Sequence, residues 1–331
     1  MKENYPEYTE FDRRIWEREL ENFLPETIID VHTHIWDESF ADSIRTPPSV
    51  LRMNVDMAAL DSWTSRIFPG RKRGYLLLPT PLLHIDRKRH NSWVAKQGTG
   101  MADPDIQFLR TGMLVHPEDS PDEVLAHIRQ AGTAALKPYR IYAKDPANAR
   151  IRDFLPEAIM EVADSEGLAI VLHLSKRDGP ADRENIEDLE RYNRRYPNTK
   201  WIMAHCIRAF NPVHLEESIQ RYAAMPNVWV DTSAINDTYT HYLILKYLDR
   251  QKVLFGSDNI AAGSFRGKYI SFGNGWKGFS QDEELEHCDS RCTYVIYEQL
   301  RCQKQAAEML SLDRRAIESV FFRNAVALFG A

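Results

Sequence analysis

Cysteine is scarce in this chain, with only Cys206, Cys288, Cys292 and Cys302 among 331 residues. This scarcity excludes the dense disulfide framework of small secreted domains. Cys288 and Cys292 stand four positions apart in a stretch that is predicted to be helical, where they could share a face with His287. Because no second pair completes a four-ligand zinc site, we interpret them as ordinary helix cysteines.

Long apolar runs and glycine-rich phosphate motifs are missing as well. No segment approaches the roughly 18 consecutive apolar residues of a membrane span, and the polar first residues, 1–14, lack the apolar stretch of a signal peptide. We therefore expect no membrane partner, and a cytoplasmic location by default. No GxGxxG or P-loop pattern occurs, which excludes the common nucleotide-binding folds.

Basic charge is not in excess either, since the formal net charge is −6. An acidic balance argues against nucleic acid as the main partner. Two local basic clusters, at residues 71–73 and 87–89, are interpreted as solvated surface, with attraction of an acidic substrate as the alternative. Apolar residues make up 43% and charged residues 27% of the sequence, which indicates a large core and excludes a disordered chain.

What the sequence does contain is a repeated alternation of short apolar runs with amphipathic helical stretches. That alternation indicates a parallel sheet with crossover helices. Helices are predicted at residues 8–23, 151–167 (ending at Gly167), 184–196, 214–225 and 238–251. Strands are predicted at residues 27–36, 73–81, 108–117, 133–143, 168–176, 200–210, 227–236 and 252–260.

Eight strands with helices between them predict an α/β fold, a (β/α)8 TIM barrel preceded by an N-terminal helix, with residues 1–331 as one domain. An open doubly wound sheet is the alternative. Two long segments, 82–105 and 259–281, follow the second and eighth strands, where barrel active sites lie. Each is interpreted as a substrate lid or binding loop. For 259–281, which holds Trp276, a packed loop or subunit contact is the alternative, and a homodimer is the expected assembly.

Five polar side chains interrupt strands that otherwise look buried. His32 and His34 are two apart, so they point to the same side of the first strand. His173, His205 and Asp258 lie toward the ends of the fifth, sixth and eighth strands. Burying each without a partner costs about 1–3 kcal/mol, and shared ligation of one cation removes that cost. Histidine with carboxylate suits Zn²⁺, with Mn²⁺ as the alternative.

These motifs resemble, as an ordered set, the amidohydrolase superfamily and within it the amidohydrolase 2 group. The matching pieces are DVHTHIW on the first strand, LHL on the fifth, AHC on the sixth, FGSD on the eighth and the closing IESVFFRNAVALFG. The resemblance spans residues 28–330. The group includes aminocarboxymuconate semialdehyde decarboxylase, related aromatic-acid decarboxylases and lactone hydrolases.

The resemblance implies one divalent metal ion held by His32, His34, His173 and Asp258. It implies that His205 stands beside the metal and contacts the substrate or the bound water. Lys137, on the fourth strand, stays open between a carbamate that bridges two metals, a cation for the substrate, and a structural role.

This set of residues favours a metal-dependent hydrolase of a lactone, amide or ester. A metal ion lowers the pKa of bound water toward neutrality, and Asp258 and His205 could exchange its protons. A metal-dependent decarboxylase of an aromatic or unsaturated acid is the alternative. A non-catalytic barrel that binds metal or ligand is a third hypothesis.

Residues near the strand ends indicate a small substrate that is cyclic or bears a carboxylate. Arg140 and Arg208 are candidate carboxylate clamps, because guanidinium binds carboxylate in a two-pronged geometry. Pairing with loop carboxylates is the alternative for both. Trp36, Tyr139 and Tyr142 could form an aromatic wall, with ordinary packing at the barrel mouth as the alternative.

Overall fold

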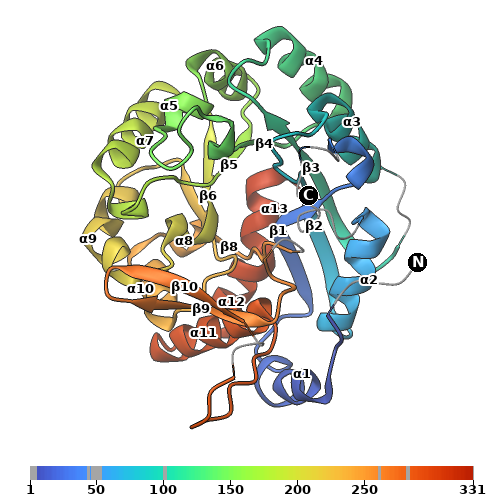
Figure 1. Ribbon diagram of the computed structural model, residues 1–331, viewed down its shortest axis with the longest axis vertical. Coiled ribbons are helices and arrows are strands. Elements are labelled where there is room, and N and C mark those ends of the chain that lie inside the picture. Colours follow the sequence, from blue (N-terminus) through green and yellow to red (C-terminus); the bar gives the residue numbers. More distant parts are fainter. Residues whose placement is uncertain are drawn as a thin grey trace.

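Eight parallel strands form a barrel surrounded by helices in the computed structural model, which describes residues 6–42, 45, 54–99, 103–259, 262–280 and 284–330 (Figure 1). The strands are β1 Thr27–Ile35, β2 Lys72–Pro79, β3 Ile106–Val115, β4 Ala135–Pro138, β5 Ala169–Leu172, β6 Lys200–Met203, β7 Val228–Asp231 and β8 Val253–Leu254. Each pairs with the next in sequence order.

The segment that continues β8 closes the barrel against β1. The Val31 amide donates to the Phe255 carbonyl at 3.0 Å, and Thr33 pairs with Asn259 in parallel orientation. The predicted (β/α)8 barrel is therefore confirmed, and the carboxyl ends of the strands, where the site is expected, lie together at one end.

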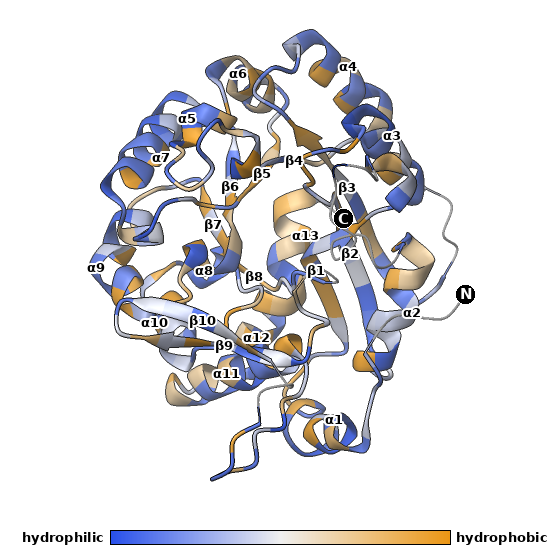
Figure 2. Ribbon diagram, in the orientation of Figure 1, coloured by the Kyte–Doolittle hydropathy of each residue, from blue (hydrophilic) through white to orange (hydrophobic). Residues whose placement is uncertain are grey.

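Helices cover the outside of the barrel, with apolar faces inward and polar faces toward solvent (Figure 2). They are α1 Glu10–Ile15, α2 Met57–Ile67, α3 Arg87–Gln97, α4 Pro121–Ala131, α5 Ile151–Phe154, α6 Glu157–Ser165, α7 Arg183–Arg195, α9 Pro212–Ala223, α10 Thr238–Tyr247, α11 Val295–Met309, α12 Arg314–Glu318 and α13 Asn324–Phe329. The short segment α8 Ala204–Arg208 directly follows β6 and is a left-handed turn, not a covering helix. Among the described helices, none is long and apolar enough to cross a membrane.

A small apolar cluster fills the barrel interior below the site. Its members come from the strands, with Ala325 and Leu328 of α13 packed against them. We call it the inner cluster; its strand residues are Ile29, Val31, Leu76, Leu78, Phe108, Ala135, Ala169, Val171, Ile202 and Leu254. The barrel is thus a packed core, which leaves only its open end for chemistry.

The two long segments are more ordered than the sequence analysis predicts. Residues 82–105 contain α3, which begins after Asp86, whose side chain caps the helix by accepting from the Arg89 amide. Residues 259–281 contain an antiparallel hairpin of β9 Gly267–Phe272 and β10 Gly275–Ser280. Residues 100–102, 260, 261 and 281 of these segments lie outside the described residues.

Three predicted helices are corrected. The stretch 151–167 is two helices, because Pro156 lacks an N–H and disfavours helical angles at the residue before it; Gly167 ends the second with φ 62°, as predicted. The first helix continues beyond Ile15 as a π-helical turn over Trp16–Leu20. Residues 284–293 contain no helix, so Cys288 and Cys292 are loop cysteines.

Candidate metal centre

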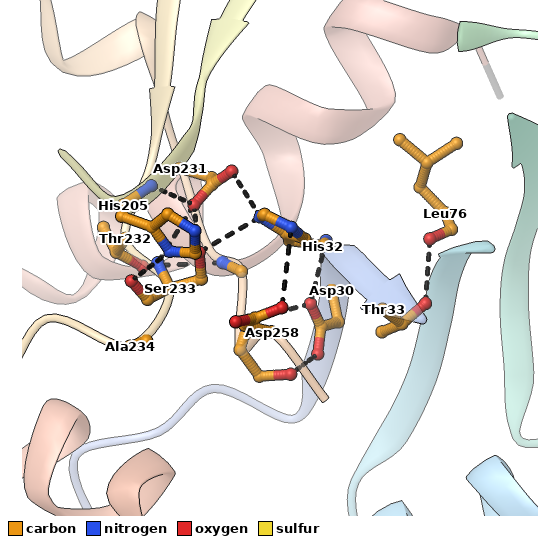
Figure 3. Close-up of polar contacts among 12 residues, drawn as sticks. Asp30, His32, Thr33, Leu76, His205, Asp231, Thr232, Ser233, Ala234 and Asp258 are labelled. Carbon is orange, nitrogen blue, oxygen red and sulfur yellow. Dashed lines mark hydrogen bonds and ion pairs between the residues drawn. The ribbon is translucent and has the colours of Figure 1, made fainter. Parts of the chain in front are cut away.

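A break in the regularity of β1 aims its two histidines into the barrel. The pairing of β1 with β2 shifts register between Asp30 and Thr33, and such a bulge re-aims the side chains that follow it. Val31 belongs to the inner cluster below the shift, yet the next residue, His32, also faces the barrel interior. The Thr33 hydroxyl instead donates to the Leu76 carbonyl at 2.8 Å (Figure 3).

His32, from near the start of the chain, lies between two carboxylates from its C-terminal third (Figure 3). Its Nδ1 is 2.9 Å from Asp231 Oδ2, at the end of β7. Its Nε2 is 3.7 Å from Asp258 Oδ1, beyond β8. Because Asp231 accepts from Nδ1–H, the lone pair of His32 lies on Nε2 and faces the centre. This is the usual way in which a carboxylate fixes a metal-binding imidazole.

His34 and Asp258 complete a group of three donor atoms. His34 Nε2 lies 3.4 Å from Asp258 Oδ1, and the donor atoms of His32, His34 and Asp258 all lie within 4.8 Å of one another. Ligand atoms about 2.0–2.2 Å from one tetrahedral cation are roughly 3.4 Å apart. The spacing of these three donors therefore fits a single ion such as Zn²⁺.

The protonation states also suit a cation. Burial lowers the pKa of His32 to about 4 and lowers the pKa of His34 and His173 as well, so the three imidazoles are neutral. Burial alone would raise the pKa of Asp258, but the hydrogen bond from His34 and the electrostatic attraction of the neighbouring histidines hold it well below its usual range. Neutral imidazole and ionised carboxylate are the forms that bind metal.

His173 and His205 stand next to this group. The ring centroid of His205 is 5.1 Å from that of His32 and 5.0 Å from that of His173. His173 Nδ1 lies 2.8 Å from the Leu174 carbonyl, so it carries the proton and leaves Nε2 free. His205 forms a second group of three close donors with His32 and Asp231. Among the described residues, His173 belongs to neither group.

A left-handed turn positions both His205 and Arg208. Four consecutive residues, His205–Arg208, have φ between 47° and 67°, a conformation that costs about 1–2 kcal/mol for each non-glycine residue. The His205 amide donates to Asp231 Oδ1 at 3.0 Å, which fixes the start of the turn. Gly179, which lies next to the Arg208 carbonyl, itself has φ 49°, a left-handed conformation that glycine adopts without strain.

Lys137 is fully buried and points at the same centre. Its Nζ is 3.1 Å from His32 Nε2 and 5.8 Å from the centroid of the Tyr139 ring. Burial lowers the pKa of Lys137 to about 8. The ammonium group occupies the lone pair of His32 Nε2 that a metal would need, so ligation by His32 requires Lys137 to lose its proton or move.

Of the candidate substrate residues, the two arginines lie near the histidines, whereas Tyr142 and Trp36 make other contacts. Arg208 is half-buried, and its charge acts on His173. Burial, and after it the charge of Arg140, lowers the pKa of Arg208. Tyr142 turns away, because its hydroxyl donates to the Leu82 carbonyl and its ring packs on His116. Trp36 is buried, and its backbone pairs with Val55.

Sequence reasoning missed the residues that hold the histidines in place. Asp231 is fully buried and accepts from His32 Nδ1, the His205 amide and Ser233 Oγ. Asp30 accepts from the His32 and Ser257 amides, each at 3.0 Å. Both aspartates interrupt apolar strands, which is the same signal that identified Asp258, so it could have found them.

The fold and this centre together define a barrel with a histidine–carboxylate site at its open end. The amidohydrolase family model matches residues 29–331, and the chain therefore belongs to the amidohydrolase family. No curated protein matches the sequence.

Solved structures share the fold at low identity. An amidohydrolase from Burkholderia multivorans with bound zinc has a TM-score of 0.60 at 11% identity, covering 92% of this chain and 99% of that one. A 5-carboxyvanillate decarboxylase from Sphingomonas paucimobilis has 0.58 at 13%, with the same coverage. A probable 2-pyrone-4,6-dicarboxylic acid hydrolase from Acinetobacter baumannii with citric acid bound has 0.57 at 14%, also covering 92% and 99%.

Proposed function

We propose that the protein is a metal-dependent hydrolase that acts on a small cyclic or carboxylate-bearing substrate. The observation that carries the proposal is the convergence of His32 Nε2, His34 Nε2 and Asp258 Oδ1, from the two ends of the chain, at ligand spacing. If the five polar strand residues each had a separate hydrogen-bond partner, nothing would require these three donor atoms to lie at ligand spacing. His173 is proposed as a further ligand and Zn²⁺ as the ion, with Mn²⁺ as the alternative.

A cation held there supplies Lewis acidity and lowers the pKa of a water molecule. The side chains around the ion orient the ligands and move protons. Asp231 fixes the tautomer of His32, and the Leu174 carbonyl fixes that of His173. Asp258 takes the proton of the attacking water. His205, whose Nδ1 lies 2.9 Å from Ser233 Oγ, holds a proton near the substrate oxygen through its other nitrogen.

The cations around the centre support an anionic substrate. Within the described residues, no carboxylate lies within ion-pair distance of Arg140 or Arg208, so the alternative of pairing with loop carboxylates finds no support there. Arg140 Nη1 donates to the Pro146 carbonyl, which holds one side of the guanidinium group in place. Lys137 is proposed as a cation that withdraws from His32 when metal binds and then faces the substrate.

Metal removal tests the proposal. Purified protein is expected to contain about one zinc or manganese per chain by elemental analysis. Chelation should abolish turnover of a lactone panel and lower the melting temperature, because a ligand bound only by the folded state stabilises it. Full turnover by verified metal-free protein would contradict the mechanism.

An aromatic-acid decarboxylase is the second candidate, favoured by the rings beside the histidines. The Tyr139 ring centroid lies 5.2 Å from that of His173, and the Phe210 centroid 5.5 Å from that of His205. Such a wall suits a flat ring. Incubation with aromatic carboxylates and detection of CO2 separates the two candidates, since the hydrolase releases acid from lactones and no gas.

A further inference from the structure

A second pocket lies beside the candidate metal centre, between the loop after β5, the start of α9 and the turn of the β9–β10 hairpin. Its volume is about 550 Å³, within the range of small-molecule sites. Arg177, Arg208 and His214 line it on one side, and Phe272 and Trp276 of the hairpin on the other. None of the residues proposed as metal ligands lines it.

The cationic side of the pocket has hydrogen-bond donors to spare. Arg208 Nη1 donates to the Lys176 carbonyl at 2.5 Å, which holds the guanidinium in place. The Nε and Nη2 groups of Arg208 donate to none of the described residues. Arg177 is exposed, and no described carboxylate lies within ion-pair distance of either arginine. Asp178 is the one carboxylate among the described residues that line the pocket.

The hairpin side offers a flat ring whose other face is already supported. The Trp276 ring stacks on Phe210 at a centroid distance of 4.5 Å and an interplanar angle of 27°. The Trp276 side chain also packs edge-on against Tyr269, and 40% of Trp276 stays exposed to solvent. A planar group can therefore stack on its free face, as aromatic pairs prefer.

The hairpin is fixed over the pocket by specific hydrogen bonds. The Asn211 side-chain amide donates to the carbonyls of Gly273 and Gly275, both at 2.8 Å. His214 Nε2 donates to the Asn274 carbonyl at 2.9 Å. The walls are thus held at a set separation, which is the preorganisation that small-ligand binding requires.

We infer that this pocket binds a small planar anion, an aromatic or conjugated carboxylate, with the ring against Trp276 and the carboxylate between Arg177 and Arg208. The pocket shares Arg208 with the candidate substrate residues of the metal centre, but binding there does not require the metal, because none of the proposed ligands lines it. The inference follows from the exposed Arg177 guanidinium, the remaining N–H groups of Arg208, the supported indole face and the volume between them.

Binding of benzoate to the full chain tests the inference, measured by calorimetry and by quenching of tryptophan fluorescence. Benzoate should bind saturably both to metal-loaded and to chelated protein, because no proposed metal ligand lines the pocket. Benzamide, which lacks the charge, and cyclohexanecarboxylate, which lacks the flat ring, should each bind at least tenfold more weakly.

Two variants locate the site. Arg177→Gln should weaken benzoate binding roughly tenfold to hundredfold, the usual effect of losing a hydrogen bond to a charged group. Trp276→Leu should weaken binding and remove the quenching. The matched control Arg183→Gln makes the same chemical change on exposed α7, outside the pocket, and should bind like the wild type.

The outcomes are decisive in both directions once each variant is shown to melt like the wild type. Loss of binding in both pocket variants, with the control unchanged, supports the inference. Binding that is absent from the wild type, lost on chelation, or unchanged in Arg177→Gln overturns it. Failure of the hydrolase proposal alone would leave benzoate binding to chelated protein intact.

Discussion

His205 is the residue that we assign to acid–base chemistry and not to metal ligation. Its Nδ1 is occupied by the hydroxyl and carbonyl of Ser233, at 2.9 and 3.1 Å. His205→Asn should keep the metal while lowering kcat by roughly 10²–10⁴, the usual contribution of one positioned acid–base group. Elemental analysis and steady-state kinetics measure the two effects. Loss of metal stoichiometry would make His205 a ligand instead.

Asp231 acts through the histidines that it orients. The carboxylate of Asp231 can only accept the hydrogen bond from His32 Nδ1, at 2.9 Å. In Asp231→Asn, the amide can either donate to or accept from Nδ1, so the tautomer of His32 is no longer fixed. Metal affinity should fall about 10–100-fold, measured by competition with a chromogenic chelator. Asp56→Asn is the matched control, because Asp56 caps α2 by accepting from the Ala59 amide and holds none of the histidines; its metal affinity should equal that of the wild type. Equal affinities for Asp231→Asn and the wild type would contradict the orienting role.

At the scale of elements, the turn of the β9–β10 hairpin is held by side chains at the start of α9, and Asn211 makes two of these contacts. Asn211 caps α9 through its Oδ1, which accepts from the Val213 amide, and clasps the hairpin through its Nδ2. Asn211→Asp keeps a good cap but places a carboxylate against two carbonyls. Hydrogen exchange should accelerate over residues 267–280 and stay unchanged over α9. Equal acceleration in both would mean that the cap was lost too.

At the scale of the whole molecule, a buried ion pair joins the N-terminal helix to the base of the hairpin. Arg266 Nη1 lies 2.9 Å from Asp12 Oδ1, and both side chains are buried. Burial alone would raise the pKa of Asp12, but hydrogen bonds from Arg266, Thr293 and Thr9 lower it overall. The pair therefore stabilises the fold above the unfolded pKa of about 4 and loses that contribution as pH falls through the lower folded pKa.

Arg266→Met should cost about 3–5 kcal/mol of unfolding free energy, because it leaves Asp12 charged and buried. The double variant Asp12→Leu, Arg266→Met should recover much of this loss. Denaturant unfolding at neutral pH measures both. Removal of the exposed Arg183–Glu187 pair is the control and should cost far less, because water and salt screen exposed ion pairs. A single variant as stable as this control would show that the buried pair contributes little.

The amino-acid sequence was enough to predict the barrel and where its strands begin, because strand and helix periodicity are local properties that each segment carries alone. It placed the ends of β4 to β8 too late, because the residues beyond those ends are just as apolar but leave the sheet to build the site. It also singled out His32, His34 and Asp258, because a polar residue in an apolar strand is visible without a partner. The tertiary structure alone decided how they meet. The bulge in β1, the left-handed turn at His205 and the contact of Asp231 with His32 arise from hydrogen bonds between residues far apart in the chain, and no local pattern encodes such distances.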